Sequence, residues 1–304
     1  MLLEKMSVFA AKVEADAGTA EALTAAEGAY NIYDLKIEPN ANFRERQKQG
    51  GFNRLPSVNE GFPGQATFSM DLVAGAAKPA WADTLLAACG IGYQTNKYAL
   101  DARPIGASGT TQKTVTLGQY EHGRLKRLYG AMGNAKFTFP SAKVCTVEFT
   151  FDGIFDELTD VAMIEPTYPA DAPLFFVDQD FTIDAWTPQI SQLTLDLGNK
   201  VYLRPGQSAT GFLHACITDR LPKLTLDPEA SLVADYDLWG LWRAMTEASA
   251  ITWKAMAGDD SAVFAATKFQ SVKLSRAGRE GVLVDQLEGQ LNADDLNIIF
   301  ATGT

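Results

Sequence analysis

The two histidines are the side chains of this sequence with the widest catalytic repertoire, because their charge changes near neutral pH. His122 lies in the segment Tyr-Glu-His-Gly-Arg, which has the pattern of a strand, a turn and a second strand. His214 lies beside Phe212, Leu213 and Cys216, as a histidine of a core or an interface would. Neither histidine has a carboxylate or a cysteine at metal-ligand spacing, so we interpret both as structural.

The sequence signatures of nucleophilic and phosphate chemistry are also missing. The segment 106–110 misses the spacing of a G-x-S-x-G elbow, and 206–211 lacks the lysine of a nucleotide loop. The acids at 178–180 and 259–260 lack the spacing of a full calcium loop and read as solvated turns. A triad or a carboxylate pair formed in space stays open, but nothing marks one. We predict that the protein is not an enzyme and holds no cofactor or metal.

Three cysteines, Cys89, Cys145 and Cys216, are an odd number and form no C-x-x-C pair. They indicate free thiols in a reducing compartment, so we expect synthesis in a cytoplasm. The N-terminus has no pattern of a secretory signal. No apolar run reaches the roughly 18 to 20 residues of a membrane helix, so no membrane is expected as a partner.

The charge balance is acidic, with 26 Lys and Arg against 37 Asp and Glu and a net charge of −11. Such a chain is poorly suited to grip nucleic acid, because binding phosphate needs a cationic surface. It suits a surface that stays near nucleic acid without holding it, and simple solubility explains it equally well. The basic clusters at 124–127 and 43–48 read as solvated strand faces.

Hydrophobic periodicity predicts a mainly β protein with few helices. Apolar residues alternate over the following segments: 33–38, 66–72, 144–151, 193–197, 224–226, 282–291 and 297–300. A period of two indicates half-buried antiparallel strands, and their short lengths favour a sandwich or small barrel. Helical patterns occur at 79–90, where Trp81, Leu85 and Cys89 share a face with Leu86, and at about 237–249.

The two halves of the sequence follow one plan of strand, helix and hairpin. The same spacing separates residue 67 from 223 and residue 85 from 241, and it shortens between the glycines at 153 and 289. This order predicts tandem β-sandwich or barrel domains at 1–165 and 166–304, each with one flanking helix, although one larger sandwich is the alternative. The prolines within 165–173 mark the boundary. An N-terminal arm over about 1–30 and a long loop at 100–118 belong to the first copy.

Several segments carry a family pattern in order along nearly the whole chain. Residues 12–29 are similar to K-x-E-x-x-x-G-T…T-A-A-x-x-A, and 79–90 (PAWADTLLAACG) look like aP-x-W-x-x-L-L-x-A-C-G. The remaining segments are 64–72, 120–123, 130–134 and ITDRLP…DPEA at 217–230. Together they resemble the major tail tube proteins of long-tailed bacteriophages, with Glu121-His122 in place of the family's usual aspartate.

This resemblance implies a non-enzymatic virion subunit that assembles into stacked rings around a DNA channel and serves genome ejection. Two domains per chain favour a ring of three copies over six. The implied partners are further copies of the chain, the tape measure protein and DNA in the lumen, and the tail terminator and tail tip proteins. The N-terminal arm and the long loop supply our candidate ring-to-ring contacts: Phe9, Arg103, Pro104 and Ile105.

Two other functions remain open from the sequence. Another virion tail protein, such as a terminator or the tube of an injection machine, would share the fold. A carbohydrate-binding or hydrolytic β-sandwich should instead expose tryptophans on a sheet face. Three tryptophans lie in predicted helices and are expected to anchor the core: Trp81, Trp239 and Trp242. The sequence does not decide whether Trp186 and Trp253 are buried or exposed. The expected location is a virion tail, assembled in the host bacterial cytoplasm.

Overall fold

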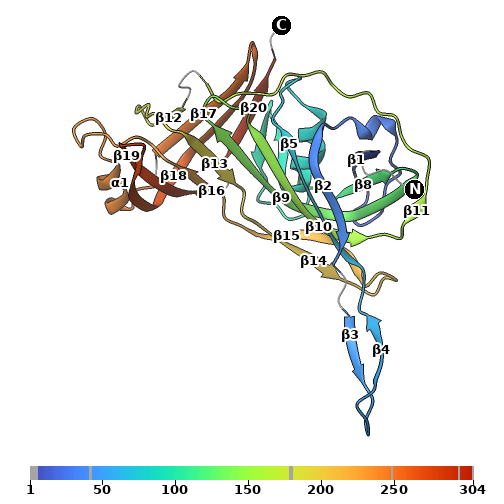
Figure 1. The fold of residues 1–304 in the computed structure, drawn as a ribbon. Coiled ribbons are helices and arrows are strands. Elements are labelled where there is room, and N and C mark those ends of the chain that lie inside the picture. Colours follow the sequence, from blue (N-terminus) through green and yellow to red (C-terminus); the bar gives the residue numbers. More distant parts are fainter. Residues whose placement is uncertain (1–5, 41–42, 178–180, 248, 294, 303–304) are drawn as a thin grey trace.

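A computed structural model describes residues 6–40, 43–177, 181–247, 249–293 and 295–302. It confirms a mainly β chain, in which most strands join one large antiparallel sheet (Figure 1). The alternating segments predicted as strands all form strands, and most of their apolar residues face a common core.

Six strands of the first half form a ladder in which each strand pairs with the next. In ladder order they are β2 (Ile32–Pro39), β5 (Pro63–Asp71), β10 (Thr146–Phe155), β9 (Arg124–Pro140), β8 (Val115–Glu121) and β1 (Ser7–Val13). The short strand β11 (Thr159–Asp160) adds to β9 beyond β10.

Six strands of the second half repeat this ladder in the same order. They are β13 (Gln192–Asp196), β16 (Lys223–Leu226), β19 (Val282–Leu291), β18 (Asp260–Arg279), β17 (Ser249–Ala257) and β12 (Phe181–Ile183). Strand β20 (Asn297–Ala301) lies on β18 as β11 lies on β9. The strand pairing of the first half therefore recurs, strand for strand, in the second.

The two ladders are joined edge to edge into one sheet. β9 pairs with β13, so that the sheet runs from the first half into the second (Figure 1). A hairpin of the first half, β6 (Ile91–Gln94) and β7 (Lys97–Leu100), adds to β20 of the second. The proline-containing stretch from 161 to 172 has no strand and connects the halves outside the sheet.

Helices are few and short. The predicted first helix forms over 80–88 with a π-helical turn, η2 (Ala82–Leu86), and Trp81, Leu85, Leu86 and Cys89 are all buried. The second helix, α1 (Leu238–Ala244), is shorter than the predicted 237–249. Met245 adopts the left-handed conformation there, and its N–H bonds back to the carbonyls of Leu241 and Trp242, which ends the helix. A 3-10 turn, η1 (Ala25–Gly28), precedes β2.

The buried core runs through both halves and is rich in aromatic rings. In the first half, Phe68 packs against Phe149 and Phe151 at centroid distances of 5.3 and 5.9 Å. Trp253, left open by the sequence, is fully buried and stacks on Phe264.

Two of the helical tryptophans depart from the sequence expectation. Trp81 is buried as predicted, but Trp239 is 36% exposed and Trp242 is only partly buried. The expectation for Trp239 is wrong because α1 lies at the free end of the sheet (Figure 1), whereas η2 packs against β1 and β6.

Four chain segments differ from the sequence prediction. The stretch expected to be an N-terminal arm contains β1, a strand paired along its length with β8; residues 1–5 lie outside the described residues. The long loop is shorter than predicted, because β8 begins at Val115 and only 101–114 is irregular. Two further hairpins were not predicted: β3 (Phe43–Gln47) with β4 (Arg54–Asn59), and β14 (Asn199–Pro205) with β15 (Phe212–Arg220).

Candidate functional site

Side chains with catalytic or metal-binding capacity lie apart in this fold. His122 occupies the turn between β8 and β9, and His214 lies on β15, where Nδ1 is 2.8 Å from the carbonyl of Ala215. Within the described ranges, no three His, Cys, Asp or Glu residues gather as metal ligands would. Asp259 and Asp260 lie at the turn between β17 and β18, and 178–180 lies outside the described residues.

The cysteines of the core are unreactive thiols. Burial raises the pKa of Cys145 to about 12. Burial also raises the pKa of Cys89, although the positive charge of Arg220 acts in the opposite direction. A thiol held protonated is a poor nucleophile, so these cysteines act as packing residues.

The joint between the halves is the ladder of β9 and β13. Across it, Phe137 pairs with Leu195, Phe139 with Leu193, and Thr138 with Thr194. Phe139 passes into the second half and packs against Trp253, Phe176 and Phe264, at centroid distances of 5.0 to 6.1 Å.

On the core side of the sheet, the first helix is enclosed by this joint. Trp81 and Tyr98 each meet Phe300 of the second half edge to face at 5.7 Å. Leu85 and Leu86 are fully buried. The joint therefore combines a strand ladder with a helix covered on its apolar side.

The two outer ends of the continuous sheet carry strand edges equivalent to the two that pair at the joint, but here no strand pairs with them within the described residues. At one end β2 pairs with β5 alone; at the other, β18 beyond Phe269 pairs with β19 alone on its strand edges, within the described ranges. Around α1 and the tip of the β18–β19 hairpin, large apolar side chains are exposed: Leu232, Val233, Trp239, Met245, Val272, Val282 and Leu283. An apolar surface of this extent on a free end is typical of an interface.

The face of the sheet opposite the core is polar and runs across both halves. One row of cross-strand neighbours consists of Thr146, Thr138, Thr194, Thr225 and Glu288. The adjacent row is Ser69, Glu148, Lys136, Asp196 and Lys223.

Two lysines of this polar face form ion pairs with its carboxylates, and the face contains a groove in the second half. Lys136 lies 3.8 Å from Glu148, and Lys223 lies 3.2 Å from Glu288. A groove of about 400 Å³ lies over β13, β16, β19 and β18, lined by Thr194, Thr225, Glu288 and neighbouring side chains. Because Lys136 and Lys223 are already paired with carboxylates, neither offers an uncompensated positive charge to phosphate.

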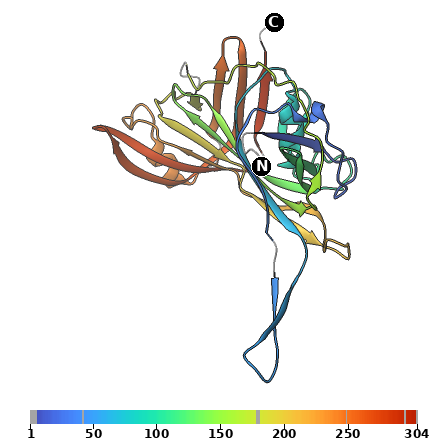
Figure 2. The ribbon, with the colours of Figure 1, turned by 45° about the vertical axis from the view of Figure 1, so that its right-hand side comes forward.

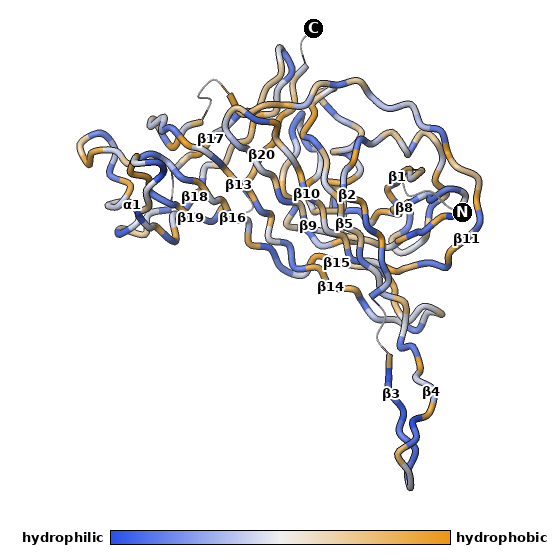
Figure 3. The backbone as a smooth tube through the Cα atoms, in the orientation of Figure 1, coloured by the Kyte–Doolittle hydropathy of each residue, from blue (hydrophilic) through white to orange (hydrophobic). Residues whose placement is uncertain are grey.

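The hairpin of β3 and β4 projects from the body of the molecule (Figures 1 and 2). Every residue of β3 is exposed, and Phe43, Phe52, Leu55 and Val58 present apolar surface to solvent. Apolar and charged residues lie side by side along the hairpin (Figure 3). Such a projecting, amphipathic element is typical of a segment that another molecule covers, and sequence analysis read it only as a charged strand face.

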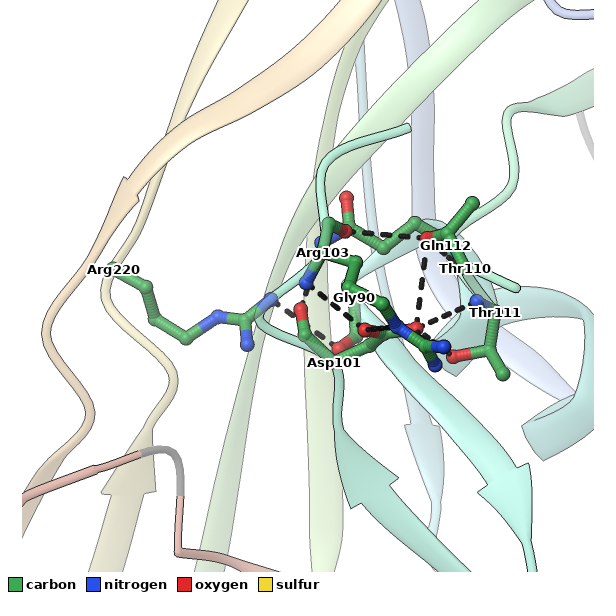
Figure 4. A network of polar contacts seen from close by, with 7 residues as sticks. All are labelled: Gly90, Asp101, Arg103, Thr110, Thr111, Gln112 and Arg220. Carbon is green, nitrogen blue, oxygen red and sulfur yellow. Dashed lines mark hydrogen bonds and ion pairs between the residues drawn. The ribbon is translucent and has the colours of Figure 1, made fainter. Parts of the chain in front are cut away.

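The loop from 101 to 114 is organised around the buried carboxylate of Asp101 (Figure 4). Arg103 donates to both carboxylate oxygens, at 2.8 and 3.0 Å, and the Thr111 N–H donates at 2.6 Å. Burial by itself would raise the pKa of Asp101, but the hydrogen bonds from Arg103 and Thr111 outweigh it and hold the pKa well below its usual range. The loop is therefore a fixed structure.

The candidate ring contacts fare differently in this structure. Phe9 is wrong as a contact, because it is 3% exposed and packs 4.7 Å from Phe68 inside the chain's own core. Arg103 is exposed, but its guanidinium is bound to Asp101. Pro104 is exposed and Ile105 is half-buried on the same loop, and nothing in a single chain tests their contact with another ring.

Segments that carry the tail tube resemblance meet in space. Glu14 is buried, and its carboxylate accepts hydrogen bonds from the N–H groups of Gly18 and Gly130, at 2.8 and 2.6 Å. Arg220 donates to the carbonyl of Gly90 at 3.2 Å, which connects β15 to the end of the first helix (Figure 4). Residues far apart in the sequence pattern thus fix one another in the fold.

Comparison with known proteins gives no further guide, since no family model matches the chain and no curated protein matches it. No helix of the described part is long and apolar enough to cross a membrane.

Proposed function

We propose that this chain is a structural subunit of a bacteriophage tail tube, which assembles with its own copies into stacked rings around a channel for DNA. One observation carries the proposal: two equivalent ladders join edge to edge, and the corresponding surfaces lie uncovered at the two ends. A unit that repeats its own joint at both ends forms a closed ring when the rotation closes, and a filament when it does not.

The number of copies follows from the internal repeat. Each chain supplies two ladders, so three chains would give a ring of six equivalent ladders. Six chains would be required if each supplied one. We therefore favour a trimeric ring over a hexameric one.

The polar face supplies a suitable channel wall in this proposal. It carries hydroxyls, amides and carboxylates, and Lys136 and Lys223 are paired with acids. With a net charge of −11 on each chain, a ring would repel phosphate and allow DNA to slide. In an assembled tail the tape measure protein would occupy the same channel before DNA does, and terminator and tip proteins would cover the tube's ends.

The projecting hairpin is our candidate for contact between successive rings. Its exposed Phe43, Phe52 and Leu55 would be covered by the neighbouring ring. Pro104 and Ile105 of the 101–114 loop remain proposed contacts at the same kind of interface.

The proposal is tested with the purified chain by sedimentation velocity and negative-stain electron microscopy over a range of protein concentrations. We expect rings of three copies and, at high concentration, hollow tubes with a regular axial repeat. Rings that never stack, even with a tail initiator present, would favour a terminator. A chain that remains a monomer at all concentrations would overturn the proposal.

A further inference from the structure

The register of the two ladders identifies residues that occupy the same place in each half. A shift of register lies beside Gly153 of β10 and beside Gly289 of β19, which makes the two glycines equivalent, so Thr146 of β10 corresponds to Val282 of β19. Thr146 pairs with Thr138, and Val282 pairs with Arg279. Arg279 is therefore the second-half equivalent of Thr138.

Pairing across neighbouring strands also identifies the residue of β2 that is equivalent to Thr194 of β13. Thr225 pairs with Thr194 on one side and with Glu288 on the other. In the same way, Gln65 pairs with Glu38 on one side and with Asp152 on the other. Asp152 and Glu288 each precede the equivalent glycine, so Glu38 is the first-half equivalent of Thr194.

At the joint inside the chain, Thr138 lies opposite Thr194. The corresponding contact between two copies would place Arg279 of β18 opposite Glu38 of β2. These side chains carry opposite charges, which favours the pairing of two directly opposed residues.

Both strand edges are accessible. β2 borders a groove of about 650 Å³ that Phe9, Ile37, Gln119 and Lys126 help to line, so space remains beside the strand. Arg279 is 31% exposed and bound to Asp227 and Glu229 of its own chain, which fixes its position.

Pro39 shapes the free edge of β2. Asn40 donates its N–H to Pro63 of β5, so Pro39 faces the other side of the strand. A proline there removes one donor and limits uncontrolled strand pairing, while its carbonyl still accepts a hydrogen bond.

The cover over the helix distinguishes this contact from simple strand addition. In the chain, η2 packs against β1 and β6 of its own half, and Trp81 at the start of the helix meets Phe300 of β20 in the second half. Its counterpart α1 lacks such a cover, and Trp239 and Met245 remain exposed. The first half of a second copy would bring its own sheet over this helix, as the second half does over η2.

We infer that the chain binds a second copy of itself head to tail, with β18 of one copy antiparallel to β2 of the next and Arg279 opposite Glu38. This inference rests on the proposed function for ring closure. Beyond the proposed function, it identifies the two surfaces that meet between copies, the antiparallel orientation of their strands and the register of the pairing.

Cysteine cross-linking tests the register. Asp196 lies opposite Lys136 at the internal joint, and their equivalents are Asn40 and Ala277. A chain with Asn40→Cys and Ala277→Cys, in a Cys216→Ser background, should form intermolecular disulfides on mild oxidation, up to a closed trimer. A matched chain with Asn40→Cys and Ser275→Cys is displaced by two residues, about 7 Å along the strand, and should cross-link about ten-fold less.

The outcomes separate the contact from the function. Equal cross-linking by both pairs, or none in a protein that sedimentation shows to be trimeric, would overturn the contact and leave the tail tube proposal standing. Loss of every oligomer in the unsubstituted chain would overturn both.

A charge exchange between copies gives a second test that does not depend on disulfides. Glu38→Arg and Arg279→Glu should each reduce self-association about ten-fold, and mixing the two single variants should restore association between unlike copies. In a contact between the two variants, either both ends are unaltered or both are exchanged, so the opposed charges stay opposite. In a contact between two copies of one variant the opposed charges are alike, so restoration requires the two variants to meet. Glu165→Arg, on the exposed connecting segment, is the control and should leave association unchanged. Weakening without restoration would overturn the opposed pair.

Discussion

At the scale of single residues, two buried carboxylates hold the parts of the first half together. Glu14 accepts from the hydroxyls of Thr114 and Thr116, at 2.6 and 2.8 Å, and from two main-chain N–H groups. It therefore joins β1 to β8 and β9 through one side chain. A carboxylate with both oxygens satisfied in this way is a point where the fold depends on a single residue.

Replacing Glu14 with alanine should lower the free energy of unfolding by about 3 kcal/mol, because it leaves several buried donors without an acceptor. Urea denaturation followed by tryptophan fluorescence measures this loss. Asp16→Ala, two residues further on and exposed, should change stability little. Equal effects from both variants would contradict the role of Glu14.

The pH dependence of stability should reveal Asp101. Its pKa is depressed in the folded chain, so its contribution is present above the pKa of the unfolded carboxyl and is lost as the pH falls below about 4. At pH 7 the free energy of unfolding of the unsubstituted protein should exceed that of the Asp101→Asn variant by about 2 kcal/mol. This difference should shrink in acid. Denaturation at pH 7, 4 and 3 measures it, and a constant difference would contradict the assignment.

At the scale of elements, strand position was predictable from alternation and strand partnership was not. The segment 66–72 alternates because one face is buried along its length, and β19 alternates in the same way from Leu287 to Leu291, so both strands follow from the sequence. The β1 segment contains Ala10 and Ala11, whose small side chains are fully buried without giving a strong pattern, so it was taken for an arm. The β3–β4 hairpin has almost no buried side chain, so no periodicity marks it.

The candidate surfaces were harder to predict because they depend on contacts between residues that lie far apart in the sequence. Arg103 and Pro104 were correctly found on an irregular loop, but the ion pair with Asp101 depends on how that loop closes. The joint surfaces depend on β9 and β13 pairing, which connects residues more than fifty positions apart. An edge left free is a property of the whole sheet, and no local sequence pattern reports it.

The projecting hairpin should separate ring formation from stacking. Replacing residues 43–59 with a short Gly-Ser turn removes exposed apolar surface without touching the core. We expect rings of normal size that no longer form tubes in electron micrographs. Phe52→Ser is a milder change and should raise the concentration needed for tubes, and unaltered tube formation by the shortened chain would exclude the hairpin from stacking.

At the scale of the whole molecule, the polar face determines how the assembly meets nucleic acid. We expect the assembled protein to bind a short DNA duplex weakly even at low salt, because Lys136 and Lys223 of this face are paired with carboxylates.

A chain with Glu148→Lys, Asp152→Lys and Asp196→Lys should bind the same duplex with a steep salt dependence. Fluorescence anisotropy between about 50 and 200 mM salt measures both proteins. Three lysine substitutions on exposed acids outside the strands, such as Glu157, Glu165 and Asp171, are the control. Equal DNA binding by the two triple variants would argue against this face as the channel wall.

The joint between β9 and β13 also has a consequence for synthesis on the ribosome. β9 is complete at Pro140, but β13 begins only at Gln192, so Phe137 and Phe139 emerge long before Leu193 and Leu195 can pair with them. During this interval a nascent chain displays an unpaired edge beside aromatic side chains, and neighbouring nascent chains on one messenger display the same edge. Premature pairing between them would be a route to misassembly, so the speed of translation between residues 140 and 192 should influence the yield of correctly folded protein.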